Sequence, residues 1–504
     1  MTSSPSEPPP SPQAFGDERA RLLDAGRPDA VERQHRRGAL TARERIARLL
    51  DATSFVEYGL LARPAHPDLD GPADGIVTGV GTLRGRPLAV VSYDYTVLGA
   101  SQGHVSHLKI DRILALAASR AWPVAIFSEG GGARAQELGI GFGTSARTFV
   151  SLARLSGQVP VVCAVVGPAF AGHANLAGLC DLVVATRRAT MGMAGPPLVE
   201  SATGERLSPE QIGPVEVHAR AGAVDLLVED DARAVDALRT YLAFFEGRGH
   251  PVDPPVPRDA LRTLVPGAAR QAYDVRKVIT ALADADSAME LRAEFARNVV
   301  TALARIDGRP VGLVASQPMV MAGAIDANAS DKIARFVQLC DAFGLPLVFL
   351  VDTPGFMVGP QVETTALVRH SARVIHALAR ASAPILTVVL RKAYGLGYYA
   401  MGSPPFDPVL AVAWPGAEFG GMGLEGAVNI LHRDEIEATG APRDVRRAHT
   451  ERLRQDHTAR ALAGRFRLDD VIDPADTRDI LARALAVAPA ARTPRADRRG
   501  IDPW

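Results

Sequence analysis

The sequence predicts an α/β protein built from two tandem domains that share one fold. The 504 residues exceed what one ordinary hydrophobic core holds. Short apolar runs recur along the chain, and they are continuous rather than alternating, which is typical of strands covered on both faces. The order of these runs in the first half returns in the second half, which indicates an internal duplication.

The two halves stay in register over a long stretch. Each half has a Gly-Arg-Pro triplet followed by an apolar run, and the triplets lie 223 residues apart. The same offset, or one residue more, relates the following anchors: Gly85 with Gly308, Lys109 with Lys332, Pro123 with Pro346, Gly132 with Gly355, and Pro160 with Pro384. Chance spacing does not explain such a register. Each half is therefore predicted to run strand, helix, strand, Gly-rich turn, helix, strand, Gly-rich turn, helix, strand.

The predicted domain boundaries come from composition. Residues 1–19 are predicted to be a disordered N-terminal tail, because its first residues are rich in Ser and Pro. The first domain is predicted to span residues 20–255 and the second residues 256–504. A Pro-rich stretch, Pro251–Pro257, reads as the linker between them.

Composition narrows the class of protein. The chain is 47% hydrophobic and 22% charged with zero formal net charge, which fits a globular enzyme and not a nucleic-acid or membrane surface. The N-terminus shows no signal peptide. The charge-free stretch Val159–Leu179 contains prolines and glycines, so it is predicted to be a buried strand, a turn and a helix start. Cys163, Cys180 and Cys340 lie far apart, which predicts no disulfide framework and a cytoplasmic location.

Lysine is rare in this chain. Only Lys109, Lys277, Lys332 and Lys392 interrupt a basic set of 56 residues that is otherwise arginine. A lysine that survives such a bias either marks a position that needs a compact ammonium group or is there by chance.

Each half has two turns of small residues at the ends of predicted strands. They are Gly130–Ala133 and Ala169–Gly172 in the first half, and Thr353–Phe356 and Tyr394–Gly397 in the second. Glycine lets the backbone turn sharply and approach a ligand, and free N–H groups at such turns suit a developing oxyanion. The alternatives to an oxyanion-binding role are that these turns bind phosphate or that they are tight loops without a ligand. No P-loop motif (G-x-x-x-x-G-K-[ST]) is present.

No side chain stands out as a catalyst. The sequence has neither a G-x-S-x-G elbow nor an H-E-x-x-H motif, and no metal is predicted. Glu129 and Glu137 flank the first turn, and surface or helix-capping roles are favoured over acid–base roles. His173 is expected to be a hydrogen-bonded structural residue. Backbone anion holes without a protein base suggest that a cofactor supplies the base.

Several long segments resemble those of one family. They are Ser128–Glu137, similar to D-S-G-G-A-R-I-Q-E, then Ala324–Phe336, Val351–Phe356, Arg391–Gly395, Gly426–Ile430 and Asp470–Arg478. Together they identify the chain as resembling the carboxyltransferase (β) subunits of biotin-dependent acetyl-/propionyl-CoA carboxylases. The resemblance runs from about Ala42 to Ala484.

The resemblance implies a fold and an assembly. Each half would be a crotonase-like (ββα superhelix) domain, and the chain would form a homo-hexamer of two stacked trimers. Each active site would lie between the N-half of one chain and the C-half of a partner. Acyl-CoA would bind the N-half and carboxybiotin the C-half, so coenzyme A enters as part of the substrate.

The resemblance also implies roles for the four turns. Ala171 and Gly172, supported by Gly131, Gly132 and Ala133, would hold the thioester oxygen while the α-carbon loses its proton. Leu396 and Gly397, near Gly355 and Phe356, would hold the ureido oxygen of biotin, whose freed nitrogen would take that proton. Such a donor pair contributes roughly 3–4 kcal/mol in a dry site.

This sequence departs from the family at the turns. Gly130 replaces a Ser, Ala171 replaces the first Gly of a C-A-G-G-A turn, and Phe170 and His173 are unusual there. In the second half G-L-G-Y-Y replaces G-G-A-Y-D. The last residue of that segment, Tyr399, falls where the family is thought to set acyl-chain size, so the acyl group stays open.

Two other functions remain possible from sequence alone. One is a biotin-dependent decarboxylase subunit of the same fold, and the other is a non-catalytic CoA-binding assembly subunit. The chain has no ATP-grasp signature and no A-M-K-M biotinylation motif. Biotin is therefore expected on a separate carrier protein, together with a biotin carboxylase partner if the reaction is carboxylation.

Overall fold

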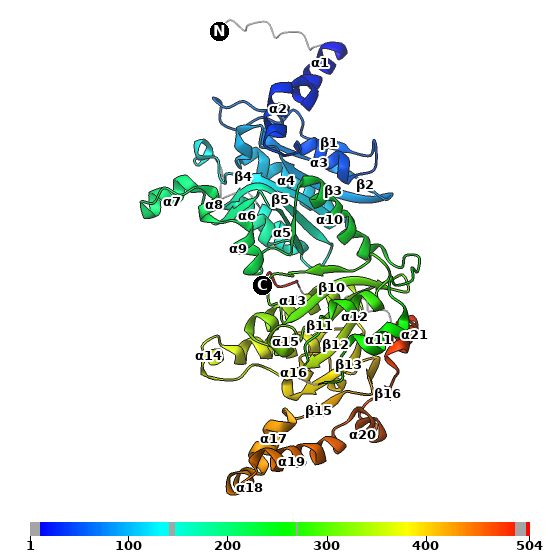
Figure 1. Cartoon of the computed structure of the whole chain (residues 1–504). Coiled ribbons are helices and arrows are strands. Elements are labelled where there is room, and N and C mark those ends of the chain that lie inside the picture. The colour runs from blue at the N-terminus through cyan, green and yellow to red at the C-terminus, as the bar shows by residue number, and fades with distance from the viewer. Residues whose placement is uncertain (1–10, 141–146, 269–270, 489–499) are drawn as a thin grey trace, which may run out of the picture. The chain divides into compact units, whose positions relative to one another are not determined.

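The chain folds into two compact units. The computed structural model describes residues 11–140, 147–268, 271–488 and 500–504. The first unit comprises residues 1–219 and 226–240, and the second comprises residues 220–225 and 241–504. Each unit is built on one twisted sheet with helices on it (Figure 1).

The sheet of the first unit has eight described strands in the order β1-β2-β3-β4-β5-β6-β8, with β7 paired to the end of β5. β1 to β3 pair antiparallel, and every later pair is parallel. The strands are β1 (Val56–Tyr58), β2 (Ile76–Leu83), β3 (Arg86–Tyr93), β4 (Val124–Gly130), β5 (Val161–Phe170), β6 (Leu182–Thr186), β7 (Thr190–Gly192) and β8 (Leu226–Val228).

The helices in this part of the chain follow the same linear order. They are α1 (Pro12–Leu22), α2 (Pro28–Arg36), α3 (Ala42–Leu49), α4 (His104–Arg120), α5 (Thr148–Leu155), α6 (Gly172–Gly178), α7 (Pro196–Thr203), α8 (Pro209–Ile212), α9 (Val215–Arg220) and α10 (Asp231–Ala243).

The sheet of the second unit repeats this plan. Its described strands run in the order β9-β10-β11-β12-β13-β14-β16, and β15 pairs with the end of β13. They are β9 (Met289–Leu291), β10 (Val299–Ile306), β11 (Arg309–Ser316), β12 (Leu347–Thr353), β13 (Ile385–Tyr394), β14 (Leu410–Ala413), β15 (Glu418–Gly420) and β16 (Asp470–Val471).

Helices lie on both faces of the second sheet. A buried cluster joins α12 and α21 to inward side chains of β10 to β14, and α13 packs against β10, β11 and α15. The helices are α11 (Leu261–Leu264), α12 (Arg276–Leu282), α13 (Ala327–Phe343), α14 (Pro360–Glu363), α15 (Leu367–Arg380), α16 (Gly395–Tyr399), α17 (Leu424–Leu431), α18 (Arg433–Ala438), α19 (Pro442–Asp456), α20 (Ala459–Gly464) and α21 (Thr477–Val487).

The predicted duplication is confirmed at the level of single residue pairs. Ala89 pairs with Val124 where β3 meets β4, and the residues 223 positions later, Gly312 and Leu347, pair where β11 meets β12. All residues of β4 and β12 are buried. That burial explains their continuous apolar sequence, since both faces of each strand are covered.

The structure differs from the predicted tail and boundary. Residues 1–10 lie outside the described residues, but α1 begins at Pro12, where Ser11 accepts a hydrogen bond from Ala14 N and caps the helix. Residues 241–255 belong to the second unit, ahead of the predicted division at 255/256. They are drawn there by main-chain pairing such as Gly249 N to Gly308 O at 2.8 Å.

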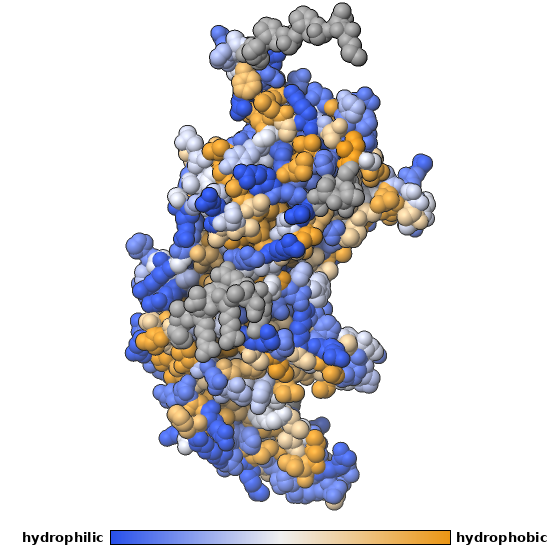
Figure 2. Space-filling view, turned by 180° about the vertical axis from the view of Figure 1, so that it is seen from behind, coloured by the Kyte–Doolittle hydropathy of each residue, from blue (hydrophilic) through white to orange (hydrophobic). Residues whose placement is uncertain are grey.

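The charge-free stretch 159–179 is strand β5 followed by a turn and α6, as predicted. Among the described residues, no helix combines the length and apolar character needed to cross a membrane. Hydrophilic and hydrophobic residues are interspersed on the face seen in Figure 2. Cys163, Cys180 and Cys340 are buried, and none of them forms a disulfide.

Two of the four lysines fill equivalent positions in the two units. Lys109 Nζ donates to the carbonyls of Gly59, Ala73 and Ile76 at 3.1, 2.8 and 2.5 Å. Lys332 Nζ donates to the carbonyls of Arg292, Phe295 and Val299 at 2.9, 2.9 and 2.7 Å. An ammonium offers three donors from one atom, which a guanidinium cannot. Both positions therefore use the compact ammonium group that the sequence analysis offered as one of its two explanations.

Replacing Lys332 by Met should lower the free energy of unfolding by about 3 kcal/mol, because it leaves buried carbonyls without a donor. Lys277, which is exposed, is the matched control, and Lys277→Met should change stability by less than about 0.5 kcal/mol. Chemical denaturation of both variants measures the difference. Equal stability of the two variants would show that the carbonyls around Lys332 Nζ do not depend on its ammonium group for stability.

Candidate active site

The first turn of each unit is held by the same main-chain bonds. After β4, Gln102 N donates to Gly132 O at 2.8 Å and Arg134 N donates to Gln102 O at 2.8 Å. After β12, Ile325 N donates to Gly355 O at 3.0 Å and Met357 N donates to Ile325 O at 2.9 Å. Both turns are therefore fixed by the segment that precedes a long helix, α4 or α13.

In each unit the two small-residue turns touch one another. A Cβ atom added to Gly132 would lie 3.3 Å from Ala171 Cβ, and one added to Gly397 would lie 2.5 Å from Gly355 Cα. Gly132 and Gly355 have φ values of +100° and +117°, which only glycine adopts readily. Glycine at these points is thus required for the close approach. The structure brings together the turns that the sequence paired.

The amides of the first unit are not all available as donors. Ala171 N donates to Gly192 O of β7 at 2.9 Å, so this amide, which the sequence assigned to the oxyanion, is already engaged. Ala171 has φ 51° and ψ −118°, a strained conformation for a residue with a Cβ. Gly172 and His173 are the first residues of α6, so their amide N–H groups have no carbonyl acceptor within the helix. Gly131 and Ala133 are exposed on either side of buried Gly132.

Sequence reasoning missed Gln102. Its side chain is 2% exposed, its Nε2 donates to the Tyr93 hydroxyl at 2.8 Å, and a Cβ atom on Gly172 would overlap its Oε1. Gln102 therefore lies directly beside the turn that starts α6. The repeat register was the one available signal, because Gln102 occupies the position that Ile325 occupies in the second half.

The second turn of the second unit is more open. Leu396 is 59% exposed and has an ordinary φ, since Gly395 before it takes the positive value of 55°. Gly397 is buried against Gly355 and Phe356. Tyr399 is partly exposed, with its ring 6.4 Å from that of Phe406 in an edge-on arrangement.

A cavity of about 410 Å³ lies beside this turn. Pro354, Lys392 and Tyr394 line it, together with residues of α17 and α19. Beneath Lys392, the buried Asp352 carboxylate lies 3.0 Å from Arg391 and 3.6 Å from Lys392. Burial raises the pKa of Asp352, and the two cations oppose that rise. The fourth lysine of the chain, Lys392, therefore borders a cavity at the end of β13.

The two flanking carboxylates have structural partners. Glu137 accepts a hydrogen bond from His104 N at 2.7 Å at the start of α4, which confirms a helix-capping role. Glu129 is neither a surface residue nor a cap, contrary to expectation. It is fully buried and its carboxylate lies 2.8 Å from the guanidinium of Arg45, which is also 2.8 Å from Asp231. A buried carboxylate requires such a partner.

His173 is buried, as a structural histidine should be, but within the described residues its ring nitrogens make no hydrogen bond of normal geometry, although the carbonyls of Ala100 and Phe170 are near. Burial lowers the pKa of His173 to about 4, so the imidazole is neutral at pH 7. Its ring lies 4.4 Å from that of Tyr93.

The imidazole of His173 fills the space above Gly130. A Cβ atom added to Gly130 would overlap His173 Nε2 and would lie 2.6 Å from Ala100 O. Glycine at position 130 therefore leaves room for the His173 ring. A serine at position 130, which the sequence resemblance leads one to expect, would overlap that ring and Ala100 O.

Gly130→Ser should therefore destabilise the protein by about 2 kcal/mol through overpacking. The double variant Gly130→Ser with His173→Ala should recover part of that loss, because the ring is gone while Ala100 O remains. Denaturation of the wild type, both single variants and the double variant gives the coupling energy. Strictly additive effects would show that the two positions do not interact.

Residues 33–500 match a family model described as the carboxyl transferase domain. The methylmalonyl-CoA carboxyltransferase 12S subunit of Propionibacterium freudenreichii subsp. shermanii is 40% identical over 95% of this chain and 94% of its own length. A biotin-dependent acetyl-/propionyl-coenzyme A carboxylase beta5 subunit of Mycobacterium tuberculosis is 36% identical over 91% of this chain and 88% of its own.

Solved structures of carboxyltransferases superimpose on this chain. A transcarboxylase 12S crystal structure, described as a hexamer with methylmalonyl-coenzyme A and methylmalonic acid bound, superimposes with a TM-score of 0.90 at 37% identity over 98% of this chain and 99% of its own. A single-chain, multi-domain long-chain acyl-CoA carboxylase superimposes with a TM-score of 0.88 at 44% identity over 94% of this chain. The match spans 48%, about half, of that longer chain.

Proposed function

The chain belongs to the carboxyl transferase domain family and is a biotin-dependent carboxyltransferase, and from this premise we propose how its two units divide the reaction. The first unit binds an acyl-CoA, and the second binds carboxybiotin presented by a separate carrier protein. The carboxyl group moves to the α-carbon of the acyl-CoA. The observation that carries the proposal is the pair of contacting turns found in each unit.

The first unit supplies the donors for the thioester oxygen. We assign this role to the Gly172 amide, which starts α6 beside the Gly131–Ala133 turn. Ala171 has its amide bonded to Gly192 O, so its part is to aim the following amide and not to donate. An N–H fixed in advance toward the oxygen stabilises the negative charge that develops when the α-carbon loses its proton.

The second unit fits a ureido ring. Leu396 is exposed, Gly397 and Phe356 present amides at the same close contact, and the 410 Å³ cavity lies alongside. These amides would hold the ureido oxygen. Biotin itself supplies the transferable carboxyl group and the nitrogen base. No described side chain is assigned as a base, which agrees with His173 and Glu129 being buried structural groups.

The finer fold and assembly follow the same proposal. The repeated sheets support two tandem crotonase-like domains, and the hexameric transcarboxylase relative supports a homo-hexamer. A biotin carboxylase and a biotin carboxyl carrier are the proposed partners in the carboxylation direction. A cytoplasmic location stays a prediction from the sequence.

The surface around Tyr399 indicates the kind of acyl group that the site accepts. Tyr399 is 39% exposed and Phe406 packs against it edge-on, so an aromatic pair stands where the family carries a carboxylate. An apolar acyl chain suits such a surface better than a charged group does. The substrate is therefore proposed to be an acyl-CoA with an apolar chain.

A panel of acyl-CoA substrates of increasing chain length tests the function. With biotin carboxylase and carrier protein added, the chain should carboxylate at least one member, and Tyr399→Asp should shift the preferred chain length. Carboxyl transfer only from a carboxylated CoA thioester to biotin would favour the decarboxylase alternative. Tight CoA binding without transfer in either direction would favour the non-catalytic subunit.

The Leu396 amide gives a sharper test of the second unit. Leu396→Pro removes one N–H while the side chain stays on an exposed position, and transfer should fall by at least about 100-fold. Leu396→Ala keeps the N–H and is the matched control, which should retain most activity. Transfer rates with saturating acyl-CoA measure the difference. Equal rates for the two variants would remove the Leu396 amide from the site.

A further inference from the structure

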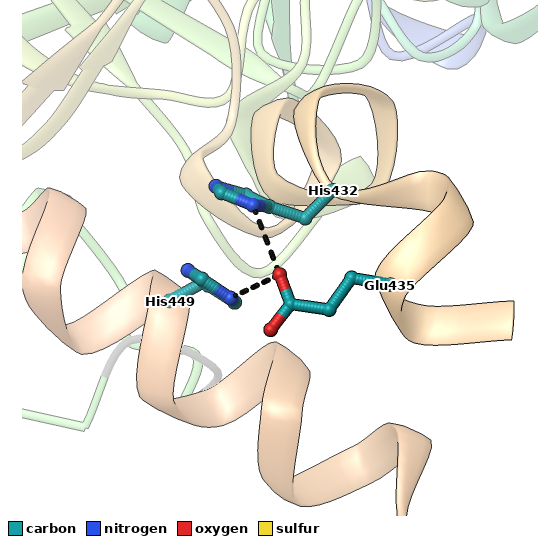
Figure 3. A group of neighbouring side chains, drawn as sticks. All are labelled: His432, Glu435 and His449. Atoms are coloured by element: carbon teal, nitrogen blue, oxygen red, sulfur yellow. Dashed lines mark hydrogen bonds and ion pairs between the residues drawn. The ribbon is translucent and has the colours of Figure 1, made fainter. Parts of the chain in front are cut away.

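Three potential metal ligands meet in the helical end of the second unit. His432 follows α17, Glu435 lies in α18, and His449 lies in α19 (Figure 3). Figure 3 shows both imidazole rings directed toward the Glu435 carboxylate. Among the described residues, this is the group of three or more such side chains that converge closely enough to share an ion. None of the three belongs to the turns assigned to carboxyl transfer.

The separations suit a small divalent cation. Glu435 Oε2 lies 3.5 Å from His432 Nδ1 and 2.9 Å from His449 Nε2, and all ligand atoms lie within 4.8 Å of one another. Ligand atoms on tetrahedral Zn²⁺ with bonds of about 2.0–2.1 Å stand about 3.3–3.4 Å apart. Small side-chain movements therefore bring the three atoms to coordinating positions.

The residue types favour zinc over other common ions. Two imidazole nitrogens and one carboxylate are a set that Zn²⁺ accepts, whereas Mg²⁺ and Ca²⁺ prefer oxygen ligands. A surface cavity of about 520 Å³ is lined by His432, Asp434 and Glu435. That opening leaves room for water as the fourth ligand.

The present ring geometry requires one adjustment. The rings of His432 and His449 are stacked with centroids 3.7 Å apart and planes 17° from parallel. A metal ion binds in the plane of an imidazole, so two stacked rings cannot share it until one of them turns. His432 is the ring free to turn, because its side chain is 35% exposed while that of His449 is 15% exposed.

The cluster differs from an ordinary histidine–carboxylate pair in this chain. His35 lies 2.9 Å from Glu44 on the first unit, yet only one imidazole is present there. At the cluster, Glu435 lies between two imidazoles.

We propose that His432, Glu435 and His449 form a Zn²⁺ site that ties α18 to α19. The sequence predicted no metal, and this site is separate from the carboxyl transfer chemistry. Its consequence is mechanical, because α17 and α19 also contribute Leu424, Thr450 and Arg454 to the lining of the 410 Å³ cavity. A bound ion would fix the helices that form one wall of that cavity.

Zinc titration of the chelator-stripped, untagged full chain tests the site. Isothermal titration calorimetry should find one Zn²⁺ per chain bound at micromolar or tighter affinity. His449→Gln and Glu435→Gln should each weaken binding at least 100-fold, since each removes one of three protein ligands. His35→Gln removes a histidine from a pair with one imidazole and should leave Zn²⁺ affinity unchanged.

A second measurement guards against misfolded variants. Zn²⁺ should raise the melting temperature of the wild type and of His35→Gln, and should leave those of His449→Gln and Glu435→Gln unchanged. Wild-type protein that binds no Zn²⁺ below millimolar concentration overturns the proposal, as does equal binding by His449→Gln. Neither outcome bears on carboxyl transfer, which is assayed separately.

Discussion

The close contact between two turns is the constraint on which each unit depends. In the second unit, Gly397 approaches Gly355 so closely that no side chain fits between them. Adjacent parallel strands make that approach possible, because their carboxyl ends meet at one edge of the sheet. Register shifts near the ends of β4 and β12, after Ser128 and Val351, then turn the chain out of the ladder. Main-chain amides are thereby exposed at a rigid position.

The two units use this common frame differently. In the first unit, Gln102 and His173 fill the space around the contact, and both are buried. In the second unit, the equivalent of Gln102 is Ile325, and a cavity opens next to the turn. Duplication has preserved the positions of the backbone while the surrounding side chains diverged. This is the pattern expected if one frame holds two different ligands.

The sequence predicted what depends on local pattern and missed what depends on distant partners. The repeat, the parallel strands and the four turns could be predicted because apolar runs and glycines mark them directly. The bond from Ala171 to Gly192 could not, because β7 is a three-residue strand with no pattern of its own. Glu129 was misjudged because its partner Arg45 lies on α3, far away in sequence. His432 and His449 likewise gave no spacing signal.

The departures from the family do not by themselves argue for an inert subunit. Every residue except proline keeps its amide N–H, so Leu396 can replace glycine provided its φ is ordinary, as it is here. The strained residue is Ala171, and it keeps its conformation because its amide bonds to β7 and its carbonyl accepts from Asn175 N. Gly130 leaves room for the His173 ring, because a Cβ atom at position 130 would overlap that ring. The backbone at the turns is thus held in place despite the strain at Ala171. This supports a catalytic role for the amides at these turns.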